Sequence, residues 1–321
     1  MLSLSQDFAY QTFYYPDDYE GQVTATLIAY KNNIGKRPAI LWLPSYNDYF
    51  FQVHVAAYFI SVGIDFYALE PRKYGNSILP VHKHPNYCRS FTEYFSELDT
   101  AIDTIIRKFS ASRLTLLGHN TGGVIASLYA NLGKYRHKLD GLILNAPLLG
   151  IPICNPLQKL SLPWIKFLAK VFPFNSSNQS IISPKYLKYL TVNDQSEWKI
   201  NHQWKRSQGL PTYYAWWLAL LDAQHYLHYR SIIEKPVLIV HAATNSNCSD
   251  ANSNVATTDV VGAITDYQRY GKKLGPKVSW YAVENACHDV TLSKEPARSV
   301  ALTIMGKFCL ETMTQPAVVS V

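Results

Sequence analysis

Residues 114–123, LTLLGHNTGG, join a buried apolar run to a glycine-rich turn that leads into a helical segment. A strand that ends in Gly-x-Ser-x-Gly before a helix presents the serine as a nucleophile at a sharp turn. Here the central position is occupied by Asn120. Nucleophilic catalysis of this kind needs an alcohol or thiol activated by a base, and an amide supplies neither. The segment therefore predicts a site built for acyl chemistry that lacks its ordinary nucleophile.

The elements that must position this turn are short apolar runs that alternate with longer amphipathic ones. Residues 23–30 alternate with period two and predict an edge strand. Continuous apolar runs, typical of strands buried on both faces, occur at 38–43, 64–69, 113–118, 140–146 and 235–241, and a last strand is predicted at 277–284. Helices are predicted at 50–63, 90–109 and 295–308, and Ser90 with Glu93 forms a capping-box pattern.

Strands separated by helices predict an α/β fold with a mostly parallel central sheet and helices on both faces. Residues 148–230 break this rhythm with proline-, serine- and asparagine-rich stretches and a long aromatic helix at 212–229. Insertions after the carboxyl ends of strands lie above the ligand crevice in such sheets. We therefore predict a core of residues 1–147 and 231–321 and a helical cap of residues 148–230.

With the turn placed between a strand and a helix, the chain resembles the α/β-hydrolase superfamily. More narrowly, it is similar to bacterial hydrolases of the serine aminopeptidase S33 and lysophospholipase-like group. The resemblance covers nearly the whole chain and rests on segments 47–52, 65–77, 85–102, 118–130, 142–149 and 288–293. It implies the α/β-hydrolase fold, an ancestry of ester or peptide hydrolysis, and no cofactor or metal.

The resemblance also implies a catalytic triad in the chain order nucleophile, acid, histidine. By position, Asn120 stands for the nucleophile and His288 for the base, while His119 is expected to pack under the turn. The group's Asp-x-Val-Leu-Asp run corresponds to TDVVGAI at 258–264, in which Asp259 remains and Ala263 replaces the second aspartate. Asp259 is therefore the candidate acid, with Asp250 as another carboxylate in the preceding loop.

The oxyanion-binding loop departs from the group as well. A His-Gly pair is expected after the strand at 38–43, but this chain has Pro44 and Ser45. Proline has no N–H and a fixed φ, and serine does not reach every backbone angle that glycine reaches. The expected donors are the backbone N–H groups of Tyr46 and Thr121, whose direction the two replacements put in question.

Four functions follow from these departures. The first is a hydrolase-fold protein without ordinary serine-hydrolase activity that keeps a capped pocket for a small apolar or acyl ligand. The second is an enzyme of another mode, such as a lyase or cyclase, in which Asn120 orients water or polarises a carbonyl and His288 acts as acid or base. The third is a hydrolase with a different nucleophile, and the fourth is a protein-interaction module. The nucleophiles considered for the third are Ser45, Thr121 and Cys287.

The pocket prediction depends on the helix at 212–229, which is apolar around well over half of its circumference. One side is expected to meet the core, and the other to line a pocket above Asn120 through Trp216, Trp217 and His225. The alternative is that this second side packs on residues 162–172 within the cap. Because the departures cluster in one site, they favour a natural loss of hydrolysis over a single engineered change.

Composition bounds the remaining possibilities. The 321 residues are 48% apolar and 17% charged, as expected of a compact globular domain with an insertion. The net charge of +7 is scattered without a dense basic run, so no nucleic-acid partner is expected. No apolar stretch is long enough to span a membrane. The five cysteines include no C-x-x-C pair, and the first residues lack a signal-peptide pattern, which together predict a cytoplasmic protein. The oligomeric state is not predicted.

Overall fold

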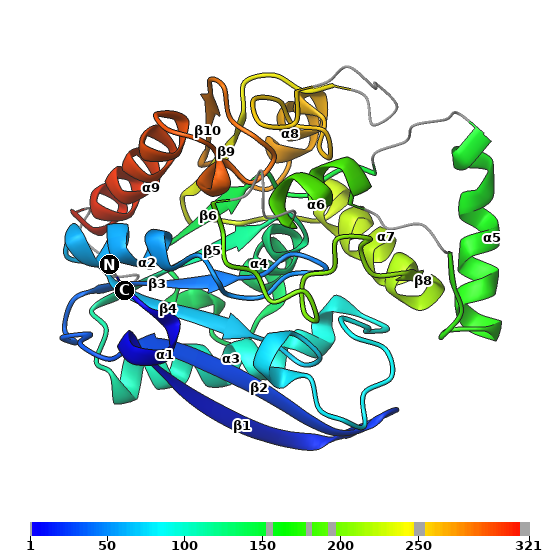
Figure 1. Ribbon diagram of the computed structural model, residues 1–321, viewed down its shortest axis with the longest axis horizontal. Coiled ribbons are helices and arrows are strands. Elements are labelled where there is room, and N and C mark those ends of the chain that lie inside the picture. Colours follow the sequence, from blue (N-terminus) through cyan, green and yellow to red (C-terminus); the bar gives the residue numbers. More distant parts are fainter. Residues whose placement is uncertain (1, 152–156, 178–181, 192–196, 247–253, 315–321) are drawn as a thin grey trace.

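The computed structural model describes residues 2–151, 157–177, 182–191, 197–246 and 254–314. Within them, an eight-stranded sheet has the order β1-β2-β4-β3-β5-β6-β9-β10 and lies at the centre of the molecule (Figure 1). Its strands are β1 (Phe8–Asp18), β2 (Gly21–Tyr30), β3 (Pro38–Leu43), β4 (Asp65–Glu70), β5 (Arg113–His119), β6 (Gly141–Asn145), β9 (Val237–Ala242) and β10 (Val278–Val283). The pairs β1–β2 and β2–β4 are antiparallel, and the others are parallel. The predicted α/β fold class is confirmed.

The prediction that residues 23–30 form an edge strand is wrong. This segment is β2, and β1 pairs along it and forms the edge instead. The N-terminal strand carries the alternation expected of an edge, since Tyr10 and Tyr14 are exposed while Phe13 and Tyr15 pack against the core. The alternation in β2 is a property of its own sequence and does not place the strand at the edge. Its position inside the sheet follows from its pairing with β1 on one side and β4 on the other.

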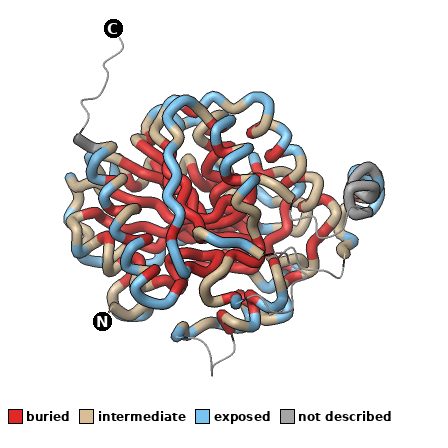
Figure 2. Tube along the Cα trace, turned by 90° about the horizontal axis from the view of Figure 1, so that it is seen from above, coloured by how far each residue is buried: buried red, intermediate tan, exposed pale blue. Residues whose placement is uncertain are grey.

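Helices cover both faces of the sheet. On one face lie α2 (Val53–Ser61) and α9 (Ala297–Thr314), which pack with Ile40 and Trp42 of β3. On the other face lie α3 (Phe95–Asp103) and α4 (Thr121–Leu132), which pack with Leu41. Each such side chain contributes about 1.5–3 kcal/mol when fully buried. Figure 2 shows the result, a buried sheet enclosed by partly exposed helices and loops.

The capping box predicted at the start of the 90–109 helix is confirmed. The Ser90 hydroxyl accepts a hydrogen bond from the Thr92 N–H at 3.2 Å, and the Glu93 carboxylate accepts one from the Ser90 N–H at 3.0 Å. A 3₁₀ turn follows, then α3 and a π-helical turn at Thr104–Lys108. The remaining short helices are α1 (Leu4–Asp7), η1 (Gly75–Ser77), η4 (Arg136–Lys138) and η5 (Val290–Leu292).

The segment between β6 and β9 contains α5 (Leu157–Val171), α6 (Pro184–Thr191) and α7 (Tyr214–Tyr229). Two short strands, β7 (Ser176–Ser177) and β8 (Thr212–Tyr213), pair beside them, and α8 (Ile264–Gly271) follows β9. Helix α7 contacts both α4 and α5. This contact places α5 beside α7, but Trp164 and Phe167 of α5 are exposed, so whether the second side of α7 packs on residues 162–172 stays a prediction.

Candidate active site

The turn at Asn120 lies between β5 and α4, at the carboxyl edge of the sheet. Asn120 has φ 49° and ψ −108°, a strained conformation for a residue with a side chain. The turn is too tight for side chains at its glycines. A Cβ at Gly118 would lie 2.4 Å from the Gly122 carbonyl oxygen, and a Cβ at Gly122 would lie 2.5 Å from that of Pro44. The sequence Gly-His-Asn-Thr-Gly thus forms a strained turn that projects the side chain of Asn120.

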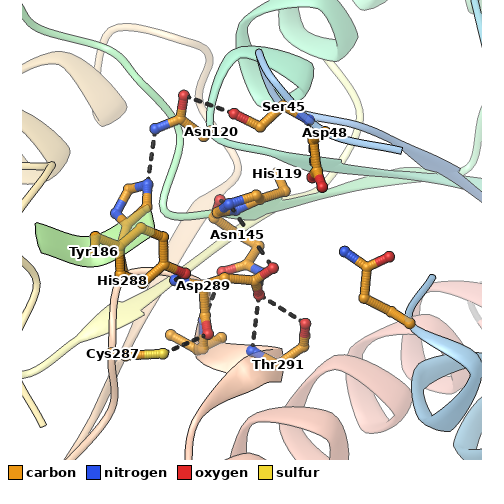
Figure 3. A network of polar contacts seen from close by, with 12 residues as sticks. Ser45, Asp48, His119, Asn120, Asn145, Tyr186, Cys287, His288, Asp289 and Thr291 are labelled. Atoms are coloured by element: carbon orange, nitrogen blue, oxygen red, sulfur yellow. Dashed lines mark hydrogen bonds and ion pairs between the residues drawn. The ribbon is translucent and has the colours of Figure 1, made fainter. Parts of the chain in front are cut away.

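Asn120, His288 and Asp259 lie in one line of hydrogen bonds. The Asn120 Nδ2 is 2.8 Å from Nε2 of His288, and the His288 Nδ1 is 2.9 Å from Oδ1 of Asp259. All three side chains belong to residues that are at most 1% exposed. Figure 3 shows the Asn120 amide directed at the His288 ring. The structure thus brings together the three residues that the family resemblance assigned to nucleophile, base and acid.

Asp259 is held as a carboxylate by several donors. Its Oδ1 accepts hydrogen bonds from the Val261 and Gly262 N–H groups, and its Oδ2 accepts one from the Tyr267 hydroxyl at 2.8 Å. Burial alone would raise the pKa of Asp259, but the charge and hydrogen bond of His288 and the two backbone N–H groups outweigh burial and lower the pKa below its usual value. Ala263 lies at the N-terminus of α8, and Asp250 lies outside the described residues.

The orientation of the Asn120 amide follows from its neighbours. The Thr121 N–H can only donate, and it lies 2.8 Å from the Asn120 Oδ1. The Asn120 nitrogen therefore faces His288 and donates to Nε2, so that Nε2 carries no proton. The ring proton of the neutral imidazole is then on Nδ1 and is donated to Asp259. His288 is thus set as an acceptor toward Asn120, the state of a general base.

The two expected oxyanion donors are both engaged within the protein. The Tyr46 N–H donates to Thr121 Oγ1 at 2.9 Å, and the Thr121 N–H donates to the Asn120 Oδ1. The Ser45 hydroxyl also donates to this Oδ1, at 3.1 Å. Ser45 does not adopt a positive φ, which falls instead on Asn47 at 57°. Ser45 is thus accommodated without a left-handed backbone, and the side chain of Asn120 receives two of the donors around the turn.

A second buried network, missed by the sequence reasoning, lies beneath the first (Figure 3). The Asp289 Oδ1 accepts hydrogen bonds from Asn145 Nδ2 at 2.6 Å and from the Thr291 hydroxyl at 2.7 Å. The His119 Nδ1 lies 3.1 Å from the Asn145 carbonyl oxygen, and its Nε2 lies 3.8 Å from Asp289 Oδ2. Burial lowers the pKa of His119. The available signal was Asn145, a polar residue at the end of a fully buried strand.

A buried ion pair joins the oxyanion loop to the segment between β6 and β9. Lys205 Nζ lies 2.6 Å from Asp48 Oδ1, and both side chains are at most 5% exposed. Beside it, Asn47 exchanges two hydrogen bonds of 3.0 Å with the backbone of Arg206. The loop that carries Tyr46 is therefore fixed by contacts with Lys205 and Arg206, which are distant from it in the sequence.

Cys287 is not activated as a nucleophile in this site. Burial raises its pKa to about 12, and its Sγ lies 3.1 Å from the Asp289 carbonyl oxygen. Both nitrogens of the adjacent His288 are directed at Asn120 and Asp259. Since the thiolate is the reactive form, a thiol with this pKa is almost wholly protonated at neutral pH.

The three residues predicted to line a pocket have different surroundings. Trp216 is fully buried, and its ring centroid lies 4.3 Å from that of Tyr46. Trp217 is partly buried, and His225 is exposed with its ring 4.9 Å from that of Tyr229. Trp216 therefore packs on the oxyanion loop, whereas His225 lies on the exposed side of α7.

Neither a metal cluster nor a membrane-spanning helix is found in the part of the chain that the structure describes. In these ranges, no group of three histidine, cysteine, aspartate or glutamate residues is arranged to hold a metal ion. None of the helices in them is both long and apolar enough to cross a bilayer.

Comparison with known proteins places this geometry in a family. The family model for serine aminopeptidase, S33, matches residues 46–290, whereas the comparison with curated proteins finds no significant match. A soluble variant of monoglyceride lipase from Saccharomyces cerevisiae, solved with a substrate analogue, is similar with a TM-score of 0.66 and 15% identity, over 95% of this chain and 97% of that one. The monoacylglycerol lipase of Paleococcus ferrophilus has a TM-score of 0.64 and 14% identity, over 95% and 99%. A lipase in an open form has a TM-score of 0.70 and 13% identity, over 96% and 100%. The likeness to these structures supports the fold, and the family match shows that the chain belongs to the serine aminopeptidase S33 family of α/β-hydrolases.

Proposed function

We propose that this chain is a hydrolase-fold protein that has lost serine-type hydrolysis. The observation that carries the proposal is the Asn120 side chain, which stands at the nucleophile position and lies 2.8 Å from His288. An amide there cannot form the covalent acyl intermediate. In a well-studied protease, loss of the triad serine reduces turnover about 10⁶-fold. The occupied N–H groups of Tyr46 and Thr121 support the same conclusion, because an incoming carbonyl would have to displace their partners.

We further propose that residues 148–230 form a cap over a site for a small apolar or acyl ligand. Trp216 supports this proposal, since it joins the cap helix α7 to the oxyanion loop through its contact with Tyr46. One structural neighbour is a monoglyceride lipase solved with a substrate analogue, which supports an acyl-type ligand. The buried thiols of Cys88, Cys287 and Cys309 support the predicted cytoplasmic location, which stays a prediction.

Binding and labelling together test the proposed function. A long-chain monoacylglycerol should raise the melting temperature, because a ligand at about 100 times its Kd adds about 2.7 kcal/mol to stability. A fluorophosphonate probe should leave the protein unlabelled, and short p-nitrophenyl esters should not be turned over. Labelling that maps to Ser45 or Cys287 would instead establish the hydrolase with another nucleophile.

A protein-interaction module is the second candidate, favoured by the closure of the site. Asn120 and His288 are each 1% exposed, and Thr121 is fully buried. A screen of monoacylglycerols, fatty acids and aromatic esters without any shift in melting temperature would support this candidate over the ligand-binding one. A dose-dependent shift would exclude a merely vestigial pocket.

A further inference from the structure

The side-chain amide of Asn120 is held as a hydrolase holds the amide that it cleaves. Its carbonyl oxygen accepts hydrogen bonds from the Thr121 N–H at 2.8 Å and from the Ser45 hydroxyl at 3.1 Å. Two donors on one carbonyl oxygen are the arrangement that stabilises the negative charge of a tetrahedral intermediate. The oxygen also lies at the N-terminus of α4, where the helix dipole favours negative charge.

The nitrogen of the same amide meets the acid–base group. Nδ2 lies 2.8 Å from Nε2 of His288, and the opposite ring nitrogen is held by Asp259 at 2.9 Å. In a catalytic triad the histidine removes a proton from the nucleophile and then delivers it to the leaving nitrogen. Nε2 of His288 carries no proton and touches the nitrogen that would leave, so it is placed to pass a proton to that nitrogen.

We propose that this site hydrolyses the side-chain amide of its own Asn120 and converts the residue to aspartate. As the hydrogen bond from Nδ2 to His288 is released, water adds to Cγ of Asn120 and gives a proton to the freed Nε2, while the negative charge collects on Oδ1. The Cγ–Nδ2 bond then breaks, and the leaving nitrogen takes the proton from His288. The reaction consumes one water and yields a carboxylic acid and ammonia, and a proton passed from the acid to ammonia gives the carboxylate and an ammonium ion. No oxidant or further reactant is needed.

The backbone favours this direct route over the common ring-forming route of asparagine deamidation. The ring-forming route needs the Thr121 nitrogen to attack Cγ, but that N–H is the donor to Oδ1 and belongs to the first residue of α4. Closing the ring would pull Thr121 out of the helix and away from its contact with Tyr46. The product, an aspartate beside His288, is a carboxylate of the kind that other hydrolytic enzymes use as a nucleophile.

Mass spectrometry of the folded chain tests the proposal. The purified protein is incubated in water enriched in heavy oxygen, and peptides containing residue 120 are followed over time. We expect conversion of amide to carboxyl with uptake of one heavy oxygen. In a His288→Gln variant the rate should fall about 100-fold or more, the usual contribution of a general acid–base group. A His54→Gln variant serves as the matched control, because the His54 ring bonds to the Thr291 carbonyl oxygen and stacks on Trp198.

Two asparagines of the same chain serve as internal references. Asn145 is buried, and its side-chain nitrogen donates to Asp289. Asn285 is exposed and has a positive φ, so it reports deamidation caused by handling. The proposal is overturned if Asn120 keeps its amide in the folded protein, or if it converts no faster than Asn285. It is equally overturned if His288→Gln converts at the wild-type rate. Any of these results leaves the proposed loss of serine-type hydrolysis intact, since that depends only on the missing alcohol.

Discussion

Nε2 of His288 accepts a hydrogen bond from the Asn120 amide at 2.8 Å, in the position where a triad histidine meets the serine hydroxyl. His288 and Asp259 are therefore bonded to each other beside an amide, which cannot be activated as an alcohol can. If the proposed loss of hydrolysis is correct, Asn120 and the hydrogen-bond donors around it are the groups to change first. This contact determines what esterase activity we expect when Asn120 is replaced by serine.

The change Asn120→Ser alone should give only weak esterase activity. It places a hydroxyl near His288, whose contact with Asp259 is already present, but the Tyr46 N–H remains bonded to the Thr121 hydroxyl. Adding Thr121→Ala frees this donor, and the double variant should exceed the single one about 100-fold in kcat, the usual effect of one oxyanion donor. The measurement is hydrolysis of p-nitrophenyl esters, with Thr121→Ala alone as the inactive control. Equal rates for the single and double variants would contradict the oxyanion argument.

The buried pair of Asp48 and Lys205 predicts a strongly non-additive pattern of stability. The change Lys205→Met should lower the free energy of unfolding by about 3–5 kcal/mol, because it leaves a buried carboxylate without its counter-ion. Adding Asp48→Asn should recover much of the loss. Urea unfolding of both single variants and the double variant checks this coupling. If the losses in unfolding free energy of the two single variants add up in the double variant, Asp48 and Lys205 do not interact in the folded protein.

Much of the scaffold could be predicted from the sequence. Buried parallel strands are continuous apolar runs, and a glycine-rich turn of this kind is expected between a strand and a helix. The strands at 113–118 and 235–241 correspond to β5 and β9. The edge was assigned wrongly, because β2 alternates in sequence but is covered by β1. Which strands pair with a given strand depends on the tertiary structure, and alternation within that strand does not determine it.

The details of the site were less accessible. Asp259 could be named as the acid candidate, but its contact with His288 depends on how the loop after β9 folds back. The bond between the Tyr46 N–H and the Thr121 hydroxyl depends on one side-chain rotamer, which no pattern of residues encodes. The Asp289 network joins residues from three separate segments, and only the polar end of β6 at Asn145 gave a local signal.

The two adjacent tryptophans of α7 should differ sharply in their contributions to stability. Trp216 is fully buried, with ring centroids of Tyr46 at 4.3 Å and Phe91 at 5.7 Å, so Trp216→Ala should cost about 3–5 kcal/mol of unfolding free energy. Trp217 is partly buried, and Trp217→Ala should cost clearly less. Chemical unfolding of the pair checks the prediction. Similar losses would show that α7 is rotated relative to the core.

The pH dependence of stability should reflect histidines that are buried in the neutral form. Burial lowers the pKa of both His119 and His241 from the ordinary value of 6.5. As the pH falls through 6.5, the unfolded chain binds protons before the folded chain does, so the free energy of unfolding falls until the lower folded pKa is reached. The stability that these residues contribute is thus present above pH 6.5 and lost below it.

The change His119→Gln isolates one part of this effect. The glutamine keeps a side-chain N–H near the Asn145 carbonyl oxygen, to which the ring of His119 is bonded, but it does not titrate. Between pH 6.5 and 5.5, the fall in unfolding free energy should be shallower in the variant by up to about 1.4 kcal/mol per pH unit, the value for one proton. Urea midpoints measured across this range give both slopes. If the two slopes are equal, His119 does not have to lose its proton for the protein to fold. The second buried network would then be held together by the attraction between a charged His119 and Asp289.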